Sequence, residues 1–310
     1  MATDAVPPCL SGVSHVMNAS VSVIIPTLGR PDTLRRAVMS ATEQTHAPAE
    51  VIVVDDNDQH PDARDETHAI AERIDAPMRV LEHTGTSGGS AARNFGAKHA
   101  SGELLAFLDD DDWWLSTKLE RQVETLQDSQ RNDIGLIYTG LRVVDEDGAM
   151  LRERYKATKP NMVHALAKQN LIGTVSSVLI PKRVFESIGG FDPELPARQD
   201  LDLWLRIARH WSIAAVPEPL TVYVNHEHGI SKDFEKKLRA HQLFLEKHRD
   251  LYDAHPELLS AYHYATALLC LKHNRVSLAR SYLLESLSAR ISLRALARLS
   301  AALLRRGTAP

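Results

Sequence analysis

The amino-acid sequence predicts a Rossmann-like α/β fold, with a mostly parallel sheet covered by helices and a C-terminal α-helical appendage. Between residues 21 and 115, short apolar runs rich in β-branched residues alternate with stretches of helical periodicity. From about residue 232 the chain is rich in leucine and alanine and has no strand pattern. Because strands that alternate with helices tend to pair in parallel, ligands are expected beyond the carboxyl ends of the strands.

Local patterns place the elements of the first half. Strands are expected at residues 21–25, 51–54, 79–81 and 104–108. After the first strand, apolar residues recur with helical spacing up to Ala41. Ser90 is expected to cap a second helix over residues 91–99, because a serine hydroxyl can accept a hydrogen bond from a free backbone N–H group.

The second half is less regular. A helix is expected after Ser116, a strand near residues 134–138 and a hairpin turn at residues 145–148. A further helix opens at Asp200, and its apolar face includes Trp204 as a core residue. These patterns divide the chain into a flexible lead (1–20), one α/β domain (21–231) and a helical appendage (232–310).

Composition excludes several classes of protein. Of 310 residues, 44% are hydrophobic and 25% charged, as in folded globular domains. A net charge of -4 and a pI near 6.4 argue against broad nucleic-acid binding. Two distant cysteines, Cys9 and Cys270, imply neither a disulfide framework nor a thiolate metal site. With no secretory-signal pattern and no apolar run of about 18 residues, a cytoplasmic location is expected.

Asp109–Asp112, hereafter the acidic cluster, directly follow a buried apolar strand and precede Trp113 and Trp114. Crowded carboxylates repel one another, and a divalent cation bound to oxygen ligands would offset that repulsion. The cluster therefore predicts metal-assisted chemistry on a phosphorylated ligand. The alternative is a solvated acidic turn, which is the usual structure of a charge run.

Five segments in the expected order resemble the family 2 inverting glycosyltransferases over about residues 21–231. They are residues 21–27, 53–56, 92–94, 107–113, and the pair 189–192 with 199–200. The resemblance implies a GT-A fold with a nucleotide-binding half (about 21–115) and an acceptor half (about 116–231). It also implies a nucleotide-sugar donor, usually a UDP-sugar, and a glycan or lipid-linked glycan as acceptor.

The resemblance also implies roles for donor-side residues. Asp111 would ligate Mn²⁺ or Mg²⁺, and Asp109 would bind the ribose or support the metal ligands, with Asp112 able to substitute in a shifted register. His226 resembles a loop histidine that approaches the metal or diphosphate, although an exposed loop histidine is an equally good interpretation. The expected nucleotide-binding residues are Pro26, Thr27, Asp56, Arg93, Asp109 and Asp110.

By the same resemblance, Asp200 would be the general base that takes a proton from the acceptor hydroxyl as it attacks the anomeric carbon. The family usually has a glutamate before this aspartate, and Gln199 occupies that place here. The alternative for Asp200 is a helix N-terminal charge that the helix dipole favours.

Two other functions stay open at this point. A nucleotidyltransferase also combines an α/β fold with metal-binding carboxylates, but residues 26–30 match its expected basic, glycine-rich loop poorly. The second alternative is a non-catalytic nucleotide-sugar-binding subunit. It stays open because Gln199 replaces the glutamate that the family usually has before the base. In the appendage, arginines recur every fourth residue within residues 290–306, beside leucines. That pattern allows peripheral contact with an anionic membrane, although packing between helices is the commoner cause.

Overall fold

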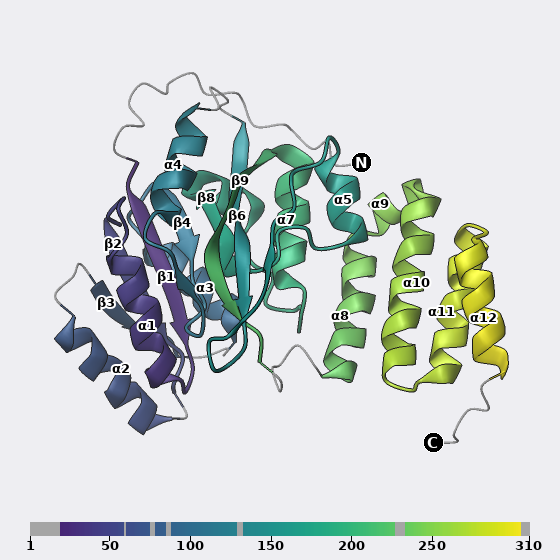
Figure 1. Ribbon diagram of the computed structural model, residues 1–310, viewed down its shortest axis with the longest axis horizontal. Coiled ribbons are helices and arrows are strands. Elements are labelled where there is room, and N and C mark those ends of the chain that lie inside the picture. The colour runs from purple at the N-terminus through teal and green to yellow at the C-terminus, as the bar shows by residue number, and fades with distance from the viewer. Residues whose placement is uncertain are drawn as a thin grey trace.

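A computed structural model describes residues 19–58, 60–74, 78–84, 88–128, 133–226 and 233–304. Its strands are β1 (Val21–Thr27), β2 (Glu50–Asp55), β3 (Met78–Glu82), β4 (Leu104–Phe107), β5 (Trp113–Trp114), β6 (Ile134–Val144), β7 (Met150–Arg154), β8 (Val178–Pro181) and β9 (Ser212–Val224). Within the described ranges they form one sheet in the order β3-β2-β1-β4-β8-β6-β9-β5, with β7 paired to β6 (Figure 1).

Strand direction divides the sheet. Strands β1 to β4 are mutually parallel where they pair, as the alternation of strands and helices predicted. Strand β8 then runs antiparallel to both β4 and β6, while β6 and β9 are parallel. The carboxyl ends of β1, β2 and β4 therefore lie at one edge, which is where ligands bind in sheets of this kind.

The α-helices between β1 and β9 are α1 (Pro31–Thr42), α2 (Pro61–Arg73), α3 (Gly89–His99), α4 (Lys118–Asp128), α5 (Met162–Lys168), α6 (Lys182–Ile188) and α7 (Gln199–His210). Alternate residues of β1 face opposite layers, as the pleat of a strand requires. Val23 and Ile25 pack in a cluster with residues of α1 and α4, whereas Ile24 packs in a second cluster with residues of α3 and α7. The sheet thus lies between two helical layers.

After β9 the described part of the chain forms five helices: α8 (Phe234–Lys247), α9 (Arg249–Ala254), α10 (Pro256–Lys272), α11 (Val276–Ala289) and α12 (Leu293–Leu304). Figure 1 shows α10, α11 and α12 side by side at the end of the molecule opposite β2 and β3. Phe244, Tyr252 and Tyr262 belong to the same apolar cluster as Ile24, so α8 to α10 share the core of the α/β region. No described helix is long and apolar enough to cross a membrane.

Asp202 anchors α8 to α7. Its fully buried carboxylate accepts hydrogen bonds from His248 Nε2 at 2.9 Å and Arg206 Nη2 at 2.7 Å, and Lys247 Nζ lies 3.0 Å away. Burial alone would raise the pKa of this carboxyl, but the His248 hydrogen bond and the charges of Arg206 and Lys247 lower it to about 2. The C-terminal helices are therefore joined to the sheet region by a buried ionic network.

Several local predictions are confirmed and two are wrong. The hairpin turn at 145–148 joins β6 to β7, α7 begins at Gln199, and Trp204 is fully buried. Strand β1 was expected to end at residue 25 but extends through Pro26. A proline has no N–H group to donate, and none is needed here because β4 stops pairing with β1 at Ile24. The cap of α3 is Gly88, with φ 128°, and not Ser90.

Candidate functional site

The acidic cluster begins two residues after β4, beside the ends of β1 and β2. Leu108 N donates to Ile24 O at 3.0 Å and Asp56 N donates to Thr27 O at 3.0 Å, so backbone hydrogen bonds hold these loops together. Two of the cluster's four carboxylates are buried and two are partly exposed.

The buried carboxylates support the turn. Asp110 accepts a hydrogen bond from Thr27 Oγ1 at 2.8 Å, and Arg30 Nη2 lies 2.6 Å from its other oxygen. Burial raises the pKa of Asp110 to about 6, although Arg30 and Thr27 act in the opposite direction. Asp112 accepts from Ser176 Oγ at 2.6 Å and from Val224 N at 3.0 Å, and burial raises its pKa well above the usual range.

Asp109 and Asp111 keep 25% and 15% of their side chains exposed, and cationic groups surround them. Arg93 pairs with Asp109, Arg30 pairs with Asp111, and His226 Nε2 lies 3.0 Å from Asp111 Oδ2. Carboxylate oxygens of Asp109, Asp111 and Asp112 lie within 4.8 Å of one another. Such a set of hard oxygen donors fits Mn²⁺ or Mg²⁺.

Asp56 is held on the next strand end. Its Oδ1 lies 2.8 Å from His83 Nδ1, and its Oδ2 accepts from Gly88 N at 2.8 Å. Asp55 is fully buried and accepts from Asn57 N at 2.8 Å. The Asp56 carboxylate is therefore fixed against α3, on the strand next to the one that ends at Pro26 and Thr27.

Asp200 lies in the first turn of α7 and is partly buried. Asn170 Nδ2 donates to Asp200 Oδ2 at 2.8 Å. Burial raises the pKa of Asp200, although a backbone hydrogen bond from Leu201 and the charge of Arg198 counteract the shift. A carboxylate with a raised pKa accepts protons more readily than an ordinary aspartate.

Arg93 and Tyr223 interact electrostatically with both the acidic cluster and Asp200. Arg93 pairs with Asp109, and the same positive charge acts on Asp200. Burial and, after it, the negative charges of the acidic cluster and of Asp200 raise the pKa of Tyr223 to about 12. Residues some 90 positions apart in the sequence thus lie in one electrostatic environment.

Two further segments of the family resemblance bind each other. Asn94 Nδ2 donates to Phe191 O at 2.7 Å, and Phe191 N donates back to Asn94 Oδ1 at 2.9 Å. Gly190, with φ 69°, lies so close that an added Cβ would be 2.6 Å from Asn94 Oδ1. The glycine is required both by its backbone conformation and by this contact.

Sequence reasoning missed four residues that shape the site: Arg30, Arg36, Asn170 and Ser176. The position of Arg30, three residues beyond the end of β1, is a signal that could have found it. Arg36 Nη2 donates to Asp111 O at 2.9 Å, and its guanidinium lies 3.9 Å from the centre of the Trp113 ring. Trp114 is buried and packs in the core. His228 and residues 229–231, which follow His226 in the same loop, lie outside the described residues.

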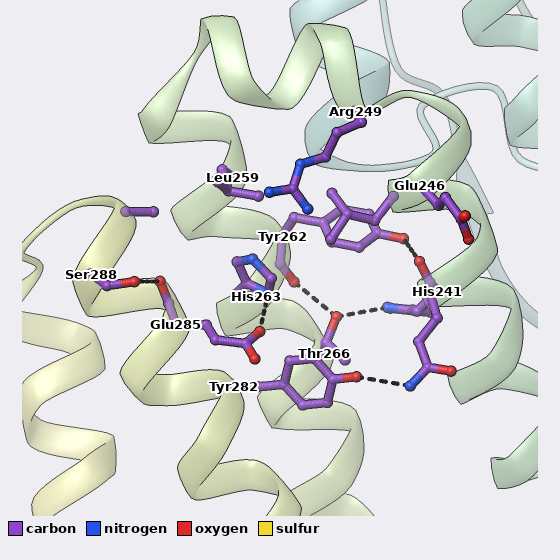
Figure 2. A pocket seen from close by; sticks show the side chains of 13 residues that line it. His241, Glu246, Arg249, Leu259, Tyr262, His263, Thr266, Tyr282, Glu285 and Ser288 are labelled. Atoms are coloured by element: carbon purple, nitrogen blue, oxygen red, sulfur yellow. Dashed lines mark hydrogen bonds and ion pairs between the residues drawn. The ribbon is translucent and has the colours of Figure 1, made fainter.

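A cavity of about 770 Å³ lies elsewhere, between α8, α10 and α11. Figure 2 shows Tyr282 and His263 among the side chains that line it, and Tyr282 Oη accepts a hydrogen bond from Gln242 on α8. The cavity has no residue of the acidic cluster in its lining. Its wall does approach the loop before α7, because the Arg198 guanidinium lies 5.4 Å from the centre of the Tyr262 ring.

The architecture is the GT-A glycosyltransferase fold, as the sequence predicted, with helices added at the C-terminus. The family described as Glycosyl transferase family 2 matches residues 22–189, more than half of the chain. The chain belongs to glycosyl transferase family 2.

Curated relatives are similar over about 200 residues. An uncharacterized glycosyltransferase of Rickettsia felis is 34% identical over 61% of this chain and 31% of its own length. The Escherichia coli protein WfgD, a UDP-Glc:α-D-GlcNAc-diphosphoundecaprenol β-1,3-glucosyltransferase, is 29% identical over 63% of this chain and 72% of its own. The Bacillus subtilis protein TuaG, a putative teichuronic acid biosynthesis glycosyltransferase, is 32% identical over 61% and 72%. The chain spans about a third of the length of the first of these.

Solved structures share the fold at low identity. A mannosyltransferase of Pyrobaculum calidifontis, solved with GDP-Man and Mn²⁺, matches 91% of this chain and 79% of its own with a TM-score of 0.58 and 18% identity. TarS of S. aureus matches 92% of this chain and 52% of its own with a TM-score of 0.61 and 19% identity.

Proposed function

We propose that this chain is a metal-dependent inverting glycosyltransferase that moves a sugar from a nucleotide sugar to a hydroxyl of a glycan or lipid-linked acceptor. The observation that carries the proposal is that Arg93 pairs with Asp109 while its charge also acts on Asp200. One positive charge therefore acts on both the donor-side acidic cluster and the candidate base. A UDP-sugar is the first donor to test, because Asp56 offers a carboxylate that can accept the imide N–H of uracil.

On the donor side, Pro26, Thr27 and Asp56 would line the nucleotide pocket at the ends of β1 and β2. Arg30 and Arg93 would bind diphosphate oxygens, because a guanidinium matches their geometry. Asp109 and Asp111, with His226 as a further candidate, would hold Mn²⁺ or Mg²⁺. The cation would stabilise the negative charge of the departing nucleoside diphosphate.

On the acceptor side, Asp200 would take the hydroxyl proton while the oxygen attacks the anomeric carbon opposite the diphosphate. Asn170 would hold the carboxylate in place through its 2.8 Å hydrogen bond. The attack forms the new glycosidic bond and breaks the bond to the diphosphate, so the configuration at the anomeric carbon inverts.

The C-terminal helix is proposed to contact an anionic membrane surface, where lipid-linked acceptors would be found. Helix α12 packs through Ala295 and Ala302, whereas Leu293 and Leu303 are 84% and 62% exposed. Exposed arginines at 290, 294 and 298 lie on the same segment. Apolar and basic side chains exposed together are typical of a helix at a lipid surface.

The test is a nucleotide-release assay with purified protein and a panel of UDP-, GDP- and dTDP-sugars, with and without Mn²⁺. We expect release from one donor, dependent on the metal, with the Asp111→Asn variant inactive. Metal-dependent UDP binding without release from any donor, even with acceptor glycans present, would favour the non-catalytic binding subunit. Formation of a nucleotide sugar from a sugar phosphate and a nucleoside triphosphate would identify a nucleotidyltransferase instead.

A further inference from the structure

His164, His255 and Glu257 bring three metal-ligating side chains together far along the chain from the acidic cluster. One ligand atom from each lies within 4.8 Å of the others, and all three residues are partly buried. The two imidazole rings meet edge to face with centroids 4.3 Å apart. His255 Nδ1 lies 3.6 Å from Glu257 Oε1, which exceeds a good hydrogen-bond length.

The ligands come from two different parts of the fold. His164 lies in α5, which packs against α7, and His255 and Glu257 lie at the start of α10 in the C-terminal helices. Figure 1 shows α5 beside α9 and α10. Near the cluster, Tyr252 Oη donates to Ala167 O at 2.8 Å, so α9 is already bound to the end of α5. The cluster therefore lies on an established junction.

The backbone at each ligand is fixed. Asn161 caps α5 by accepting from His164 N at 3.0 Å, and Leu258 N donates to His255 O at 2.8 Å. The ring of His164 is available to a ligand. Within the part of the chain that the structure describes, neither of its ring nitrogens has a hydrogen-bond partner. His255 and Glu257 keep 36% and 37% of their side chains exposed, so a cation can reach them.

We propose that His164, His255 and Glu257 form a Zn²⁺ site that joins α5 to α10. Two imidazoles and one carboxylate are a donor set that zinc prefers, with water as the fourth ligand. Tetrahedral zinc separates its ligand atoms by roughly 3.3 Å, so ligand atoms that lie within 4.8 Å of one another need to close by at most about 1.5 Å. Mg²⁺ and Ca²⁺ are disfavoured because they select oxygen ligands.

The site has a structural consequence for the candidate base. Asn170, which holds Asp200, follows α5 by two residues. A cation between α5 and α10 would fix the C-terminal helices against the segment that positions Asp200. This zinc site does not depend on the proposed transfer reaction, and its occupancy can be measured without substrate.

The test is calorimetric titration of full-length protein with ZnCl₂ after treatment with chelator. The protein carries Asp111→Asn, which weakens the acidic cluster, and this variant is the parent in the zinc measurements. We expect about one equivalent with a dissociation constant of about 1 µM or tighter. His164→Ala and His255→Ala should each weaken this binding at least tenfold. His210→Ala, an exposed histidine at the end of α7, is the matched control and should bind zinc as the parent does.

Thermal melting supplies the second measurement. Zinc at about 100 times its dissociation constant should raise the parent's melting temperature by about 5 °C, and this rise should be absent in His164→Ala. Melting in chelator shows whether the variant folds, and Glu257→Gln is a milder replacement if it does not. Zinc binding that is unchanged in both histidine variants, or binding weaker than about 100 µM in the parent, would overturn the proposal.

Discussion

Asn170 donates a hydrogen bond to Asp200 across 30 residues of sequence, with 2.8 Å between Nδ2 and Oδ2. The amide is itself fixed, because Asn170 Oδ1 accepts from the backbone N–H groups of Ile172 and Gly173. Asp200 thus has a partner that both orients its carboxylate and favours its ionised form.

Loss of that hydrogen bond should change the pH dependence of the reaction. Burial raises the pKa of Asp200 and the Asn170 hydrogen bond partly offsets the rise, so Asn170→Ala should raise the pKa further. A base works only when ionised, and the acidic limb of the rate profile should move to higher pH. Asn161→Ala, which removes the α5 cap instead, should leave this limb in place; an equal displacement in both variants would contradict the role of Asn170.

Asp202 should stabilise the junction between α7 and α8. Its pKa of about 2 lies below the unfolded value of about 3.9, so its contribution of about 2 kcal/mol is present above pH 4 and lost as pH falls toward 2. Asp202→Asn should cost about 3 kcal/mol at pH 7, because His248, Arg206 and Lys247 lose their partner. Urea unfolding between pH 2 and 7 measures both effects.

The matched control for Asp202 is Asp250, which also pairs with an arginine of α7, Arg209, but has 66% of its side chain exposed. Water screens such a pair, and Asp250→Asn should cost less than about 1 kcal/mol. Equal losses in the two variants would show that burial at the junction contributes nothing.

Gly190→Ala should destabilise the protein more than Gly189→Ala. Both glycines have positive φ, and a Cβ at Gly189 would meet no atom within 4 Å, whereas one at Gly190 would lie 2.6 Å from Asn94 Oδ1. The first change should cost about 1 kcal/mol from backbone strain, and the second about 1–3 kcal/mol more from the clash. Denaturant midpoints of the two variants give the comparison, and equal midpoints would exclude the steric role.

Binding of α12 to lipid can be tested by liposome flotation. We expect the full-length protein to float with anionic vesicles at low salt, and Arg294→Glu with Arg298→Glu to weaken binding more than tenfold, because each basic residue contributes about 1 kcal/mol. The control is Arg73→Glu with Arg152→Glu, which changes the net charge by the same amount at exposed positions outside α12. Failure of the parent to float would rule out the contact. Point variants are preferable to truncation at Ala289, since Arg280 donates to Ala302 O.

The sequence predicted the parallel half of the sheet and the edge at which its acidic residues gather, because both follow from short-range periodicity and one topological rule. It could not predict that Asn170 contacts Asp200 or that Asp202 accepts from His248, since these contacts depend on how distant segments pack. The family resemblance singled out Asp109 and Asp111, which are partly exposed, but it did not predict that Asp110 and Asp112 are buried. Their burial depends on contacts with Thr27, Ser176 and Val224, which are distant in the sequence.

Asp111 and Asp200 are proposed to have separate tasks in one reaction. The most direct test measures metal-dependent UDP binding by calorimetry and turnover by nucleotide release in the parent and in both asparagine variants. We predict that Asp200→Asn binds UDP as the parent does but turns over about 10²–10⁴ times more slowly, whereas Asp111→Asn loses the metal-dependent part of binding. Full turnover in Asp200→Asn, or metal-dependent binding that survives in Asp111→Asn, would contradict these two roles.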